Sequence, residues 1–226
     1  MIFHIVTCNT TRHIIPAQLW LFKRYAPDHE VKYLDMKDYP IKDWCKNVAN
    51  CLEQVKDKYI YFGLDDYLPI DYLMEEQIPI SSGIMEHCDR LGIGYGCRLH
   101  QPVEPYEGIL KYTPETPYQA SCQFSVWNRE SLIRVLKEVD GSPWDFEIKG
   151  RCRTFALKEP AFRWIEESAL SKRQPEKVNV LGLRPDDVNE LVNLGFLDPD
   201  KIIYGWNGHT TFKPEYAGEK YGEFYV

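Results

Sequence analysis

The sequence lacks several features that mark common classes of protein. It has no apolar run approaching the roughly 20 residues that a membrane-spanning helix needs. It has no long run of basic residues either, and its formal net charge is −7 with a pI of about 5.4. Proteins that bind nucleic acids usually carry basic patches that neutralise phosphates. The composition therefore argues against a membrane-spanning helix and against a nucleic acid as partner.

Other absences concern the cellular compartment and the type of catalysis. The seven cysteines are odd in number and form no CxxC pair. This indicates free thiols in a reducing compartment instead of a disulfide frame or a zinc site. The N-terminal apolar stretch is too short for a signal peptide. No Gly-x-Ser-x-Gly motif supports Ser-His-Asp catalysis. We expect a soluble, cytoplasmic protein, and contact with a membrane surface stays open.

The abundant residues fit a globular protein. Apolar residues make up 44% of the chain, which is enough for a sizeable core. Aromatic residues make up 14%, and 15 of them are tyrosines. Rings with polar tips suit a carbohydrate site, and they suit an ordinary core edge equally well. With 226 residues, no internal repeat and no clear linker, the chain predicts a single domain over residues 1–226.

Patterns of strand and helix alternate over the first third of the chain. Strand patterns occupy residues 2–7, 31–36 and 59–64, and apolar residues at helical spacing fall within 14–25 and 44–55. This order favours right-handed crossovers between parallel strands. It predicts an α/β fold with a mostly parallel central sheet and helices on both faces, like the nucleotide-binding half of a Rossmann fold.

The rest of the chain is less regular. Four prolines between residues 100 and 117 predict a loop with at most one short strand, at 108–112. Ser142 and Pro143 form a strong helix start signal. The remaining patterns predict, in order, a helix over 84–91, a strand over 92–96, a strand over 118–127, a helix from 128, one more strand within 155–165 and a small helix within 183–195.

Two adjacent carboxylates, Asp65 and Asp66, follow the strand pattern at 59–64. Open α/β sheets bind ligands at the carboxyl ends of their strands. Adjacent carboxylates repel each other, and a hard divalent ion such as Mg²⁺ or Mn²⁺ neutralises them, typically together with a substrate phosphate. The pair is therefore a candidate metal site. An Asp-rich turn is the alternative that this pair alone leaves equally open.

A second pair of carboxylates, Asp145 and Glu147, lies near the start of the helix that Ser142 and Pro143 begin. A carboxylate beside an acceptor hydroxyl can act as a general base. The helix dipole also stabilises a carboxylate at this position, so helix capping is the alternative for each residue.

Three further residues give weaker signals. Arg12 follows the first strand pattern and suits a phosphate or a solvated surface. Asp35 ends the second strand pattern and suits a nucleotide base or ribose, with a turn as the alternative. His209 lies in a Gly-rich tail and suits a metal or a diphosphate, although a lone histidine is more often a surface or packed residue.

Three motifs carry a resemblance to a known family. They are Tyr-Ile-Tyr-Phe-Gly-Leu-Asp-Asp-Tyr-Leu at 59–68, Gln-Phe-Ser-Val-Trp-Asn-Arg at 123–129 and Pro-Trp-Asp-Phe-Glu at 143–147. In order and spacing the chain resembles glycosyltransferases of the type-A (GT-A) fold. It is similar in particular to small bacterial and viral sugar transferases of polysaccharide synthesis. The resemblance spans roughly residues 1–150.

This resemblance implies a nucleoside-diphosphate sugar as donor and a glycan or another hydroxyl compound as acceptor. Asp65 and Asp66 are implied to hold Mn²⁺ or Mg²⁺ against the diphosphate, and Asp145 or Glu147 to deprotonate the acceptor, with inversion at the anomeric carbon. Residues 1–100 are implied to form the donor half and 101–226 the acceptor half. The residues implied to line the nucleotide-sugar site are Thr7, Asn9, Arg12, Asp35 and Asp65.

The chain departs from the family pattern in two places. Leu-Asp-Asp-Tyr replaces a regular Asp-x-Asp, which leaves open whether Asp65 or Asp66 contacts the metal and whether the metal is required. His209 and Lys213 in the tail resemble the C-terminal His and Lys of some retaining transferases. The stereochemical outcome is therefore open as well.

Two other functions remain as alternatives. A nucleotidyltransferase acting on sugar phosphates shares a related sheet and metal carboxylates. Such enzymes usually have a Gly-rich loop after the first strand, and residues 8–12 contain no glycine. A non-catalytic carbohydrate-binding protein that kept the fold is the third possibility, and the two carboxylate pairs argue against it.

Overall fold

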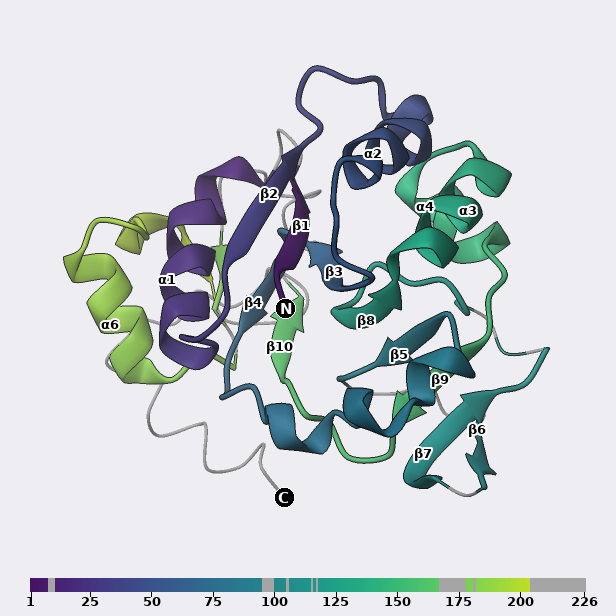
Figure 1. Ribbon diagram of the computed structural model, residues 1–226. Coiled ribbons are helices and arrows are strands. Elements are labelled where there is room, and N and C mark those ends of the chain that lie inside the picture. Colours follow the sequence, from purple (N-terminus) through teal and green to yellow (C-terminus); the bar gives the residue numbers. More distant parts are fainter. Residues whose placement is uncertain are drawn as a thin grey trace.

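The chain builds an eight-stranded sheet with the strand order β2-β1-β3-β8-β5-β9-β7-β6 (Figure 1). The computed structural model describes residues 1–7, 11–94, 100–104, 106–114, 116, 118–166, 178–180 and 182–203. Two short sheets accompany the large one, in which β4 pairs with β10 and β11 pairs with β12.

The first third of the chain alternates between strands and helices, as the sequence predicts. The elements in order are β1 (Phe3–Thr7), α1 (Ile15–Tyr25), β2 (Val31–Asp35), α2 (Trp44–Glu53) and β3 (Tyr59–Leu64). Short 3₁₀ turns precede both helices, at Arg12–Ile14 and Ile41–Asp43.

The later part of the chain completes the large sheet and adds three longer helices. The elements are β4 (Tyr67–Pro69), β5 (Arg90–Gly92), β6 (His100–Val103), β7 (Tyr106–Tyr112), β8 (Ser125–Asn128), α3 (Arg129–Val139), α4 (Pro143–Lys149), β9 (Thr154–Leu157), β10 (Trp164–Glu166), β11 (Val178–Asn179), α6 (Pro185–Asn193) and β12 (Ile202–Ile203). Four more 3₁₀ turns lie at Glu75–Gln77, Ile80–Ser82, Ile84–Glu86 and Pro199–Lys201.

Strand direction confirms the predicted fold class. β1 is parallel to β2 and β3, and β5 is parallel to β9. β8 is antiparallel to β3 and β5, and β7 is antiparallel to β9 and β6. Six strands therefore run one way and only β8 and β7 run against them. The fold is α/β, with a mixed, mostly parallel central sheet.

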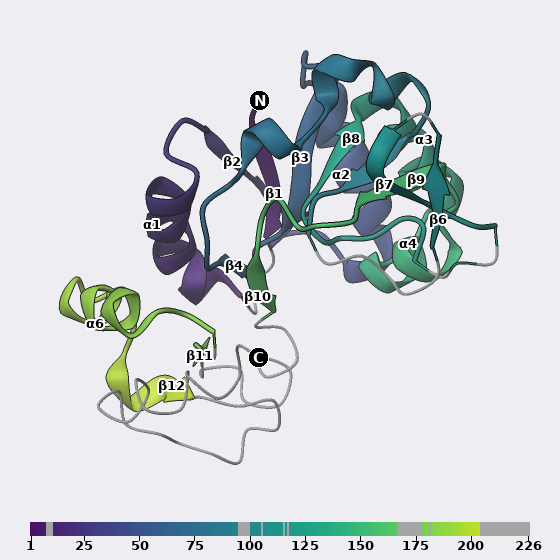
Figure 2. The ribbon, with the colours of Figure 1, turned by 90° about the horizontal axis from the view of Figure 1, so that it is seen from below.

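Each face of the sheet is covered by helices (Figures 1 and 2). One face packs α1 through Leu21 and Phe22 against Phe3 and Tyr61. The opposite face packs α2, α3 and α4, and the buried residues of this second cluster include Ile60, Phe62, Val48, Leu136 and Phe146. Alternate residues of β3 thus belong to different cores, which explains why this strand is apolar on both sides. Fully burying one such side chain contributes about 1.5–3 kcal/mol.

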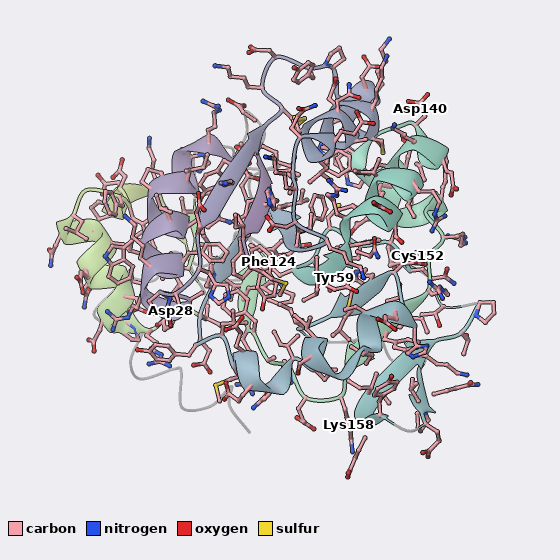
Figure 3. The ribbon with its side chains drawn as sticks, in the orientation of Figure 1. Asp28, Tyr59, Phe124, Asp140, Cys152 and Lys158 are labelled. Carbon is pink, nitrogen blue, oxygen red and sulfur yellow. The ribbon has the colours of Figure 1, made fainter. Side chains whose placement is uncertain are left out.

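Gly63 fixes how the start of β8 meets the end of β3. A Cβ atom at Gly63 would lie 2.2 Å from Cδ1 of Phe124, so the aromatic ring occupies the space that a side chain would need. Phe124 is fully buried and lies near the middle of the molecule (Figure 3). The glycine in the strand therefore allows residues just before β8 to pack tightly beside the turn that follows β3.

The segment around α6 is attached to α1 by polar contacts. Asp187 is fully buried, accepts a hydrogen bond from the hydroxyl of Tyr25, and lies 3.0 Å from Nε of Arg24. Figure 2 shows α6 beside α1, with β11 and β12 nearby. Burial is the main cause that raises the pKa of Tyr25 to about 12, and its bond to Asp187 adds to the effect.

Three predicted elements are wrong in extent. The helix predicted over 84–91 is only a 3₁₀ turn at Ile84–Glu86, because Arg90 already pairs with β8 and β9 as the first residue of β5. The strand predicted over 118–127 is confined to Ser125–Asn128. Residues 155–165, for which one strand is predicted, overlap two.

The proline-rich segment 100–117 also differs from the prediction. It forms a hairpin of two strands, β6 and β7, instead of a loop with at most one strand. Pro102 is tolerated in β6 because that strand lies at the edge of the sheet, where one side needs no hydrogen-bond donor.

Two predictions about the chain as a whole can be compared with the described residues. The five cysteines among them, Cys45, Cys51, Cys88, Cys122 and Cys152, are free, as predicted. Within the same part of the chain, no helix combines the length and the apolar character needed to cross a membrane.

Candidate functional site

The carboxyl ends of β1, β2 and β3 meet at one edge of the sheet. Thr7 pairs with Asp35 in register, and Val6 pairs with Leu64. The backbone N–H of Asp65 donates to the carbonyl of Val6 over 3.1 Å. The structure thus brings three of the predicted site residues, Thr7, Asp35 and Asp65, to the same edge. Asn9 and His209 lie outside the described residues.

The Asp65-Asp66 turn is buried and is held by hydrogen bonds from two side chains. The exposed fraction of Asp65 is 3% and that of Asp66 is 8%. The hydroxyl of Thr11 donates to Oδ2 of Asp65 over 2.6 Å. Nε2 of Gln18 lies 3.0 Å from the carbonyl oxygen of Asp65 and 2.8 Å from that of Tyr67. The segment is a turn with a fixed, buried conformation.

Gln18 is itself fixed by a second contact. The hydroxyl of Tyr33 donates to Oε1 of Gln18 over 2.8 Å, and Gln18 is fully buried. Burial, with a smaller contribution from the negative charge of Asp65, raises the pKa of Tyr33. One amide on α1 thus connects β2 to the turn after β3. The sequence gives a signal for Gln18, because it is a polar residue on the apolar face of a helix. It lies four residues from Ile14 and four from Phe22.

We expect Gln18→Ala to lower the free energy of unfolding by about 2–4 kcal/mol, because the substitution leaves the partly buried hydroxyl of Tyr33 and two carbonyl groups without their partner. Urea unfolding measures this difference. Gln101→Ala is the matched control, since Gln101 is exposed on β6 and should change the free energy of unfolding by less than about 0.5 kcal/mol. Equal effects of the two substitutions would contradict the role of Gln18.

Arg12 and Asp35 form an exposed ion pair beside the turn. Nη2 of Arg12 contacts Oδ2 of Asp35, and Oδ1 of Asp35 accepts a hydrogen bond from the backbone N–H of Lys37 over 3.0 Å. The side chains are 41% and 37% exposed, so a ligand can reach both of them. Thr7 is buried beside them, and its hydroxyl has no hydrogen-bond partner among the described residues.

Glu147 reaches the same region from α4. Its Oε1 accepts a hydrogen bond from the backbone N–H of Cys122 over 2.8 Å and another from the hydroxyl of Ser121 over 3.2 Å. Both donors belong to the irregular segment just before β8, which lies beside the end of β3. Ser121 also accepts from the backbone N–H of Gln123 over 3.2 Å. Glu147 is therefore oriented by the backbone of a second element.

The thiol of Cys122 is influenced by one carboxylate of each predicted pair. It is fully buried, and burial is the main cause that raises its pKa. The negative charges of Glu147 and Asp66 raise this pKa further, so both carboxylates lie within electrostatic range of the thiol. Asp66 and Glu147 are 81 positions apart in the sequence. The fold thus brings one carboxylate of each predicted pair, Asp66 and Glu147, within electrostatic range of the same thiol.

A buried arginine, Arg90, lies near this segment. Arg90 on β5 is 2% exposed, and its Nε donates to the hydroxyl of Ser125 over 2.9 Å. Its Nη1 has no hydrogen-bond partner among the described residues. The positive charge of Arg90 acts to lower the pKa of Cys122, opposite to the two carboxylates.

Asp145 occupies a different position from Glu147. Asp145 and Ser142 form a capping box. The hydroxyl of Ser142 accepts a hydrogen bond from the backbone N–H of Asp145, and the carboxylate of Asp145 accepts one from the backbone N–H of Ser142. Nζ of Lys149 lies 2.6 Å from Oδ1 of Asp145. The contact with Lys149, followed by those with Ser142, lowers the pKa of the Asp145 carboxyl below its ordinary value. These contacts are those of a helix cap.

We expect Asp145→Asn to lower the melting temperature at pH 7 by about 2–4 °C. The folded state depresses the pKa of Asp145. Its stabilising contribution is therefore present above the unfolded pKa of about 4 and is lost as the pH falls through the lower folded value. The difference in melting temperature between wild type and variant should shrink as the pH is lowered from 5 towards 2. A difference that stays constant over that range would contradict this account.

The residues at this edge fit a divalent cation that arrives with a phosphate ligand. Mg²⁺ is usually held by one or two carboxylates together with substrate phosphates and water. Asp65 and Asp66 supply that number of carboxylates from one turn. Among the described residues, no group of three or more His, Cys, Asp or Glu side chains could hold a metal ion without such a ligand.

Four contributors to this site have no clear signal in the sequence. Ser121 and Cys122 lie in a segment that resembles a strand, and Thr11 and Arg90 gain meaning only from what they contact. Each contact joins residues that are more than 20 positions apart, so local sequence patterns do not reveal it.

Comparisons with known proteins find only distant structural similarities. No family model and no curated protein sequence matches the chain. Solved structures with a related arrangement include A197 from STIV, with 14% identity, coverage of 74% of this chain and 85% of that chain, and a TM-score of 0.44. S. aureus TarS 1–349 in complex with UDP is 13% identical, with coverage of 71% of this chain and 59% of that chain and a TM-score of 0.42. HddC from Yersinia pseudotuberculosis is 10% identical, with coverage of 86% of this chain and 78% of that chain and a TM-score of 0.41. At these values the similarities define neither a family nor an activity.

Proposed function

We propose that this protein is a metal-dependent glycosyltransferase that moves a sugar from a nucleoside-diphosphate donor to a hydroxyl group of a glycan or similar acceptor. The observation that carries this proposal is geometric: the start of β8 pairs with the end of β3, so the segment before β8, which holds Glu147 through Cys122, meets the sheet where the Asp65-Asp66 turn follows β3. One carboxylate comes from the turn that suits a metal and diphosphate, and the other from a helix start that suits a base.

The donor is assigned to the edge formed by β1, β2 and β3. Asp66 and Asp65 are the residues that would hold Mn²⁺ or Mg²⁺, and that ion would neutralise charge on the departing diphosphate. Thr7, Arg12 and Asp35 lie where a nucleoside would extend along the edge, and the exposed guanidinium of Arg12 can pair with a phosphate. Asn9 and His209 keep their predicted roles as ligands of the nucleotide and the metal.

Within the metal pair we assign direct metal contact to Asp66. Oδ2 of Asp65 already accepts the short hydrogen bond from Thr11, and its carbonyl is held by Gln18. These contacts suit a residue that fixes the turn and supports the ion from one side. The charge of Asp66, in contrast, acts on the same thiol as the charge of Glu147, so we place the reacting sugar between Asp66 and Glu147.

Glu147 is the proposed general base. It takes the proton from the acceptor hydroxyl while the oxygen forms a bond to the anomeric carbon. The bond from that carbon to the diphosphate breaks, and its electron pair leaves with the nucleoside diphosphate. The hydrogen bonds from Cys122 and Ser121 to one carboxylate oxygen orient the group. Attack from the side opposite the leaving group inverts the anomeric carbon.

Asp145, the other candidate for the base, is proposed as a helix cap instead. Its carboxylate is already used by Ser142 and by Lys149, and the lowered pKa makes it a weak base. The donor residues come from 1–100 and Glu147 from 101–226, in agreement with the proposed division into a donor half and an acceptor half within one domain. The free thiols fit a reducing compartment such as the cytoplasm.

Donor turnover tests this proposal. The protein is incubated with UDP-, GDP- and dTDP-sugars and Mn²⁺, with and without EDTA, and release of nucleoside diphosphate is followed. We expect release with one nucleotide class, lost on chelation. No release and no thermal shift with any nucleotide would overturn the proposal. Release of pyrophosphate from a nucleoside triphosphate and a sugar phosphate would point to a nucleotidyltransferase instead.

A further inference from the structure

A pocket with a volume of about 590 Å³ lies away from the Asp65-Asp66 edge. Its size falls in the range of small-molecule sites. Asp89 precedes β5, and Cys152 and Arg153 precede β9, whereas Asp65 follows β3. These three strands run in the same direction, so the pocket and the Asp65-Asp66 turn lie at opposite edges of the sheet. The lining residues are Asp89, Tyr112, Pro114, Gln119, Arg134, Arg151, Cys152 and Arg153.

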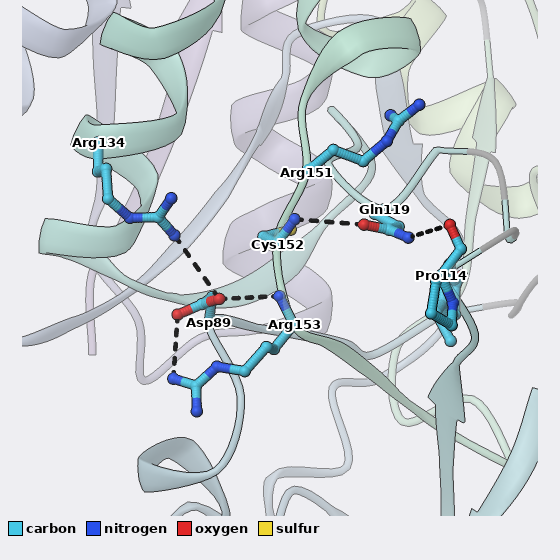
Figure 4. A pocket seen from close by; sticks show the side chains of 8 residues that line it. Asp89, Pro114, Gln119, Arg134, Arg151, Cys152 and Arg153 are labelled. Carbon is cyan, nitrogen blue, oxygen red and sulfur yellow. Dashed lines mark hydrogen bonds and ion pairs between the residues drawn. The ribbon is translucent and has the colours of Figure 1, made fainter.

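The lining carries three arginines and a single carboxylate, in a chain whose net charge is −7. Figure 4 shows Arg134 and Arg153 on either side of Asp89, with Arg151 across Cys152 from them. Nη2 of Arg153 lies 3.3 Å from Oδ1 of Asp89, and Nη2 of Arg134 lies 3.7 Å from Oδ2. Nη1 of Arg134 also lies 3.2 Å from both carboxylate oxygens of Glu138. The positive charge that a ligand would meet in this pocket therefore comes mainly from Arg151 and Arg153.

Asp89 has no remaining capacity for a ligand. Its Oδ1 also accepts from the hydroxyl of Ser131 over 2.8 Å, and its Oδ2 accepts from the backbone N–H of Arg153 over 2.8 Å. Burial alone would raise the pKa of Asp89, but the hydrogen bonds from Arg153 and Ser131 hold it below its ordinary value. Asp89 thus stays ionised and serves to position the two guanidinium groups.

Gln119 is also fully used. Its Oε1 accepts from the backbone N–H of Cys152 over 3.4 Å, and its Nε2 donates to the carbonyls of Thr113 and Pro114 over 3.2 and 3.0 Å. The thiol of Cys152 contacts the hydroxyl of Thr154 over 3.2 Å. These groups form a wall and do not compete for a ligand.

The arginines keep unused hydrogen-bond donors. Nη1 of Arg151 donates to the carbonyls of Ile148 and Gly150, which fixes this side chain at the end of α4. Among the described residues, Nε and Nη2 of Arg151 and Nε and Nη1 of Arg153 have no protein acceptor. A pocket that offers several positively charged donors favours a ligand rich in anionic acceptors.

We propose that this pocket binds a sugar phosphate, with the phosphate held by the unused donors of Arg153 and the sugar lying against Tyr112 and Pro114 towards Arg151. Planar guanidinium groups match the geometry of phosphate oxygens. The separation of Arg151 from the other two arginines fits a ligand larger than a single phosphate (Figure 4). The site is independent of the proposed transferase activity, because it shares no residue with the Asp65-Asp66 edge.

Direct binding tests the proposal. The Nε–Hε signals of the arginines are followed by NMR as glucose 6-phosphate, inorganic phosphate or glucose is added, in EDTA so that no metal-bound site competes. We expect the signals of Arg151 and Arg153 to shift with glucose 6-phosphate, to shift less with phosphate and to stay unchanged with glucose. Affinity should fall as the salt concentration rises. Unchanged signals with both phosphates would overturn the proposal.

Variants separate this site from a general attraction of anions. Arg153→Gln should weaken glucose 6-phosphate binding at least tenfold, and Arg153→Lys should weaken it less. Arg184→Gln is the matched control, because Arg184 is an exposed arginine paired with one aspartate, Asp71, outside the pocket. It should leave binding unchanged. Equal losses in Arg153→Gln and Arg184→Gln, or no loss in Arg153→Gln when circular dichroism shows it folded, would contradict the assignment.

Discussion

Glu147→Gln is expected to reduce the rate of sugar transfer by about 10²–10⁴-fold, the usual contribution of a general base. Glutamine keeps the shape of the side chain and can still accept the hydrogen bonds from Cys122 and Ser121. It cannot take a proton from the acceptor. Donor affinity, measured by calorimetry with the nucleoside diphosphate and Mn²⁺, should therefore stay within about twofold of wild type, and the loss should fall on kcat.

Asp145→Asn is the matched control for this experiment, because it alters a neighbouring carboxylate on the same helix. It should lower thermal stability and leave kcat nearly unchanged, since its carboxylate is used by Ser142 and Lys149. The opposite pattern, with normal turnover in Glu147→Gln and lost turnover in Asp145→Asn, would transfer the role of base to Asp145. Normal turnover in both variants would remove the base from this helix altogether.

Asp66→Ala is expected to weaken Mn²⁺-dependent binding of a nucleoside diphosphate by about 100-fold or more, which corresponds to about 2.8 kcal/mol. The substitution removes one of two carboxylates that would hold the ion, and the diphosphate then meets less compensated charge. Calorimetry with and without EDTA measures the metal-dependent part. In EDTA, wild type and variant should bind equally weakly.

Asp71→Ala is the control for Asp66→Ala, because Asp71 is an exposed aspartate whose partner is Arg184. It should leave metal-dependent binding unchanged. Asp65→Ala should affect both binding and stability, because the carboxylate of Asp65 is bonded to Thr11. If Asp66→Ala binds the diphosphate and Mn²⁺ like wild type, Asp66 is not a metal ligand.

The part of the site that the sequence predicts is the part that depends on local patterns. An apolar strand that ends in Asp65-Asp66, and a helix that starts at Ser142 and Pro143, can each be recognised within about ten residues. The alternation of strands and helices then predicts that β1, β2 and β3 end at one edge. This is why the α/β class, the position of Asp65 and the cap at Ser142 could be predicted without a structure.

The remaining features depend on contacts between distant segments. β8 lies between β3 and β5 and runs against both, and no pattern in its four residues indicates this. That placement brings the segment before β8 to the end of β3 and gives Glu147 its backbone donor, Cys122. The choice between Asp145 and Glu147 also rests on distant geometry. Asp145 finds its partners within its own helix, while Glu147 finds them 25 and 26 positions away.

Two predicted segments are wrong because strand pairing in the folded protein outweighs local sequence preference. The four prolines between residues 100 and 117 favour a loop, yet β6 and β7 form a hairpin at the sheet edge. The apolar residues from Ile84 to Leu91 fit a helix equally well, but β5 gains more from pairing with two neighbouring strands. Propensity is a weak guide in both cases because packing decides.

A crystal soaked with a nucleoside diphosphate and Mn²⁺ tests the central claim most directly, because manganese can be located by its anomalous scattering. The account predicts a manganese peak about 2 Å from a carboxylate oxygen of Asp66, with the diphosphate bound to the same ion and the nucleoside lying along Thr7 and Asp35. Manganese and diphosphate bound away from the Asp65-Asp66 turn, or no binding at concentrations that saturate the protein in solution, would contradict it.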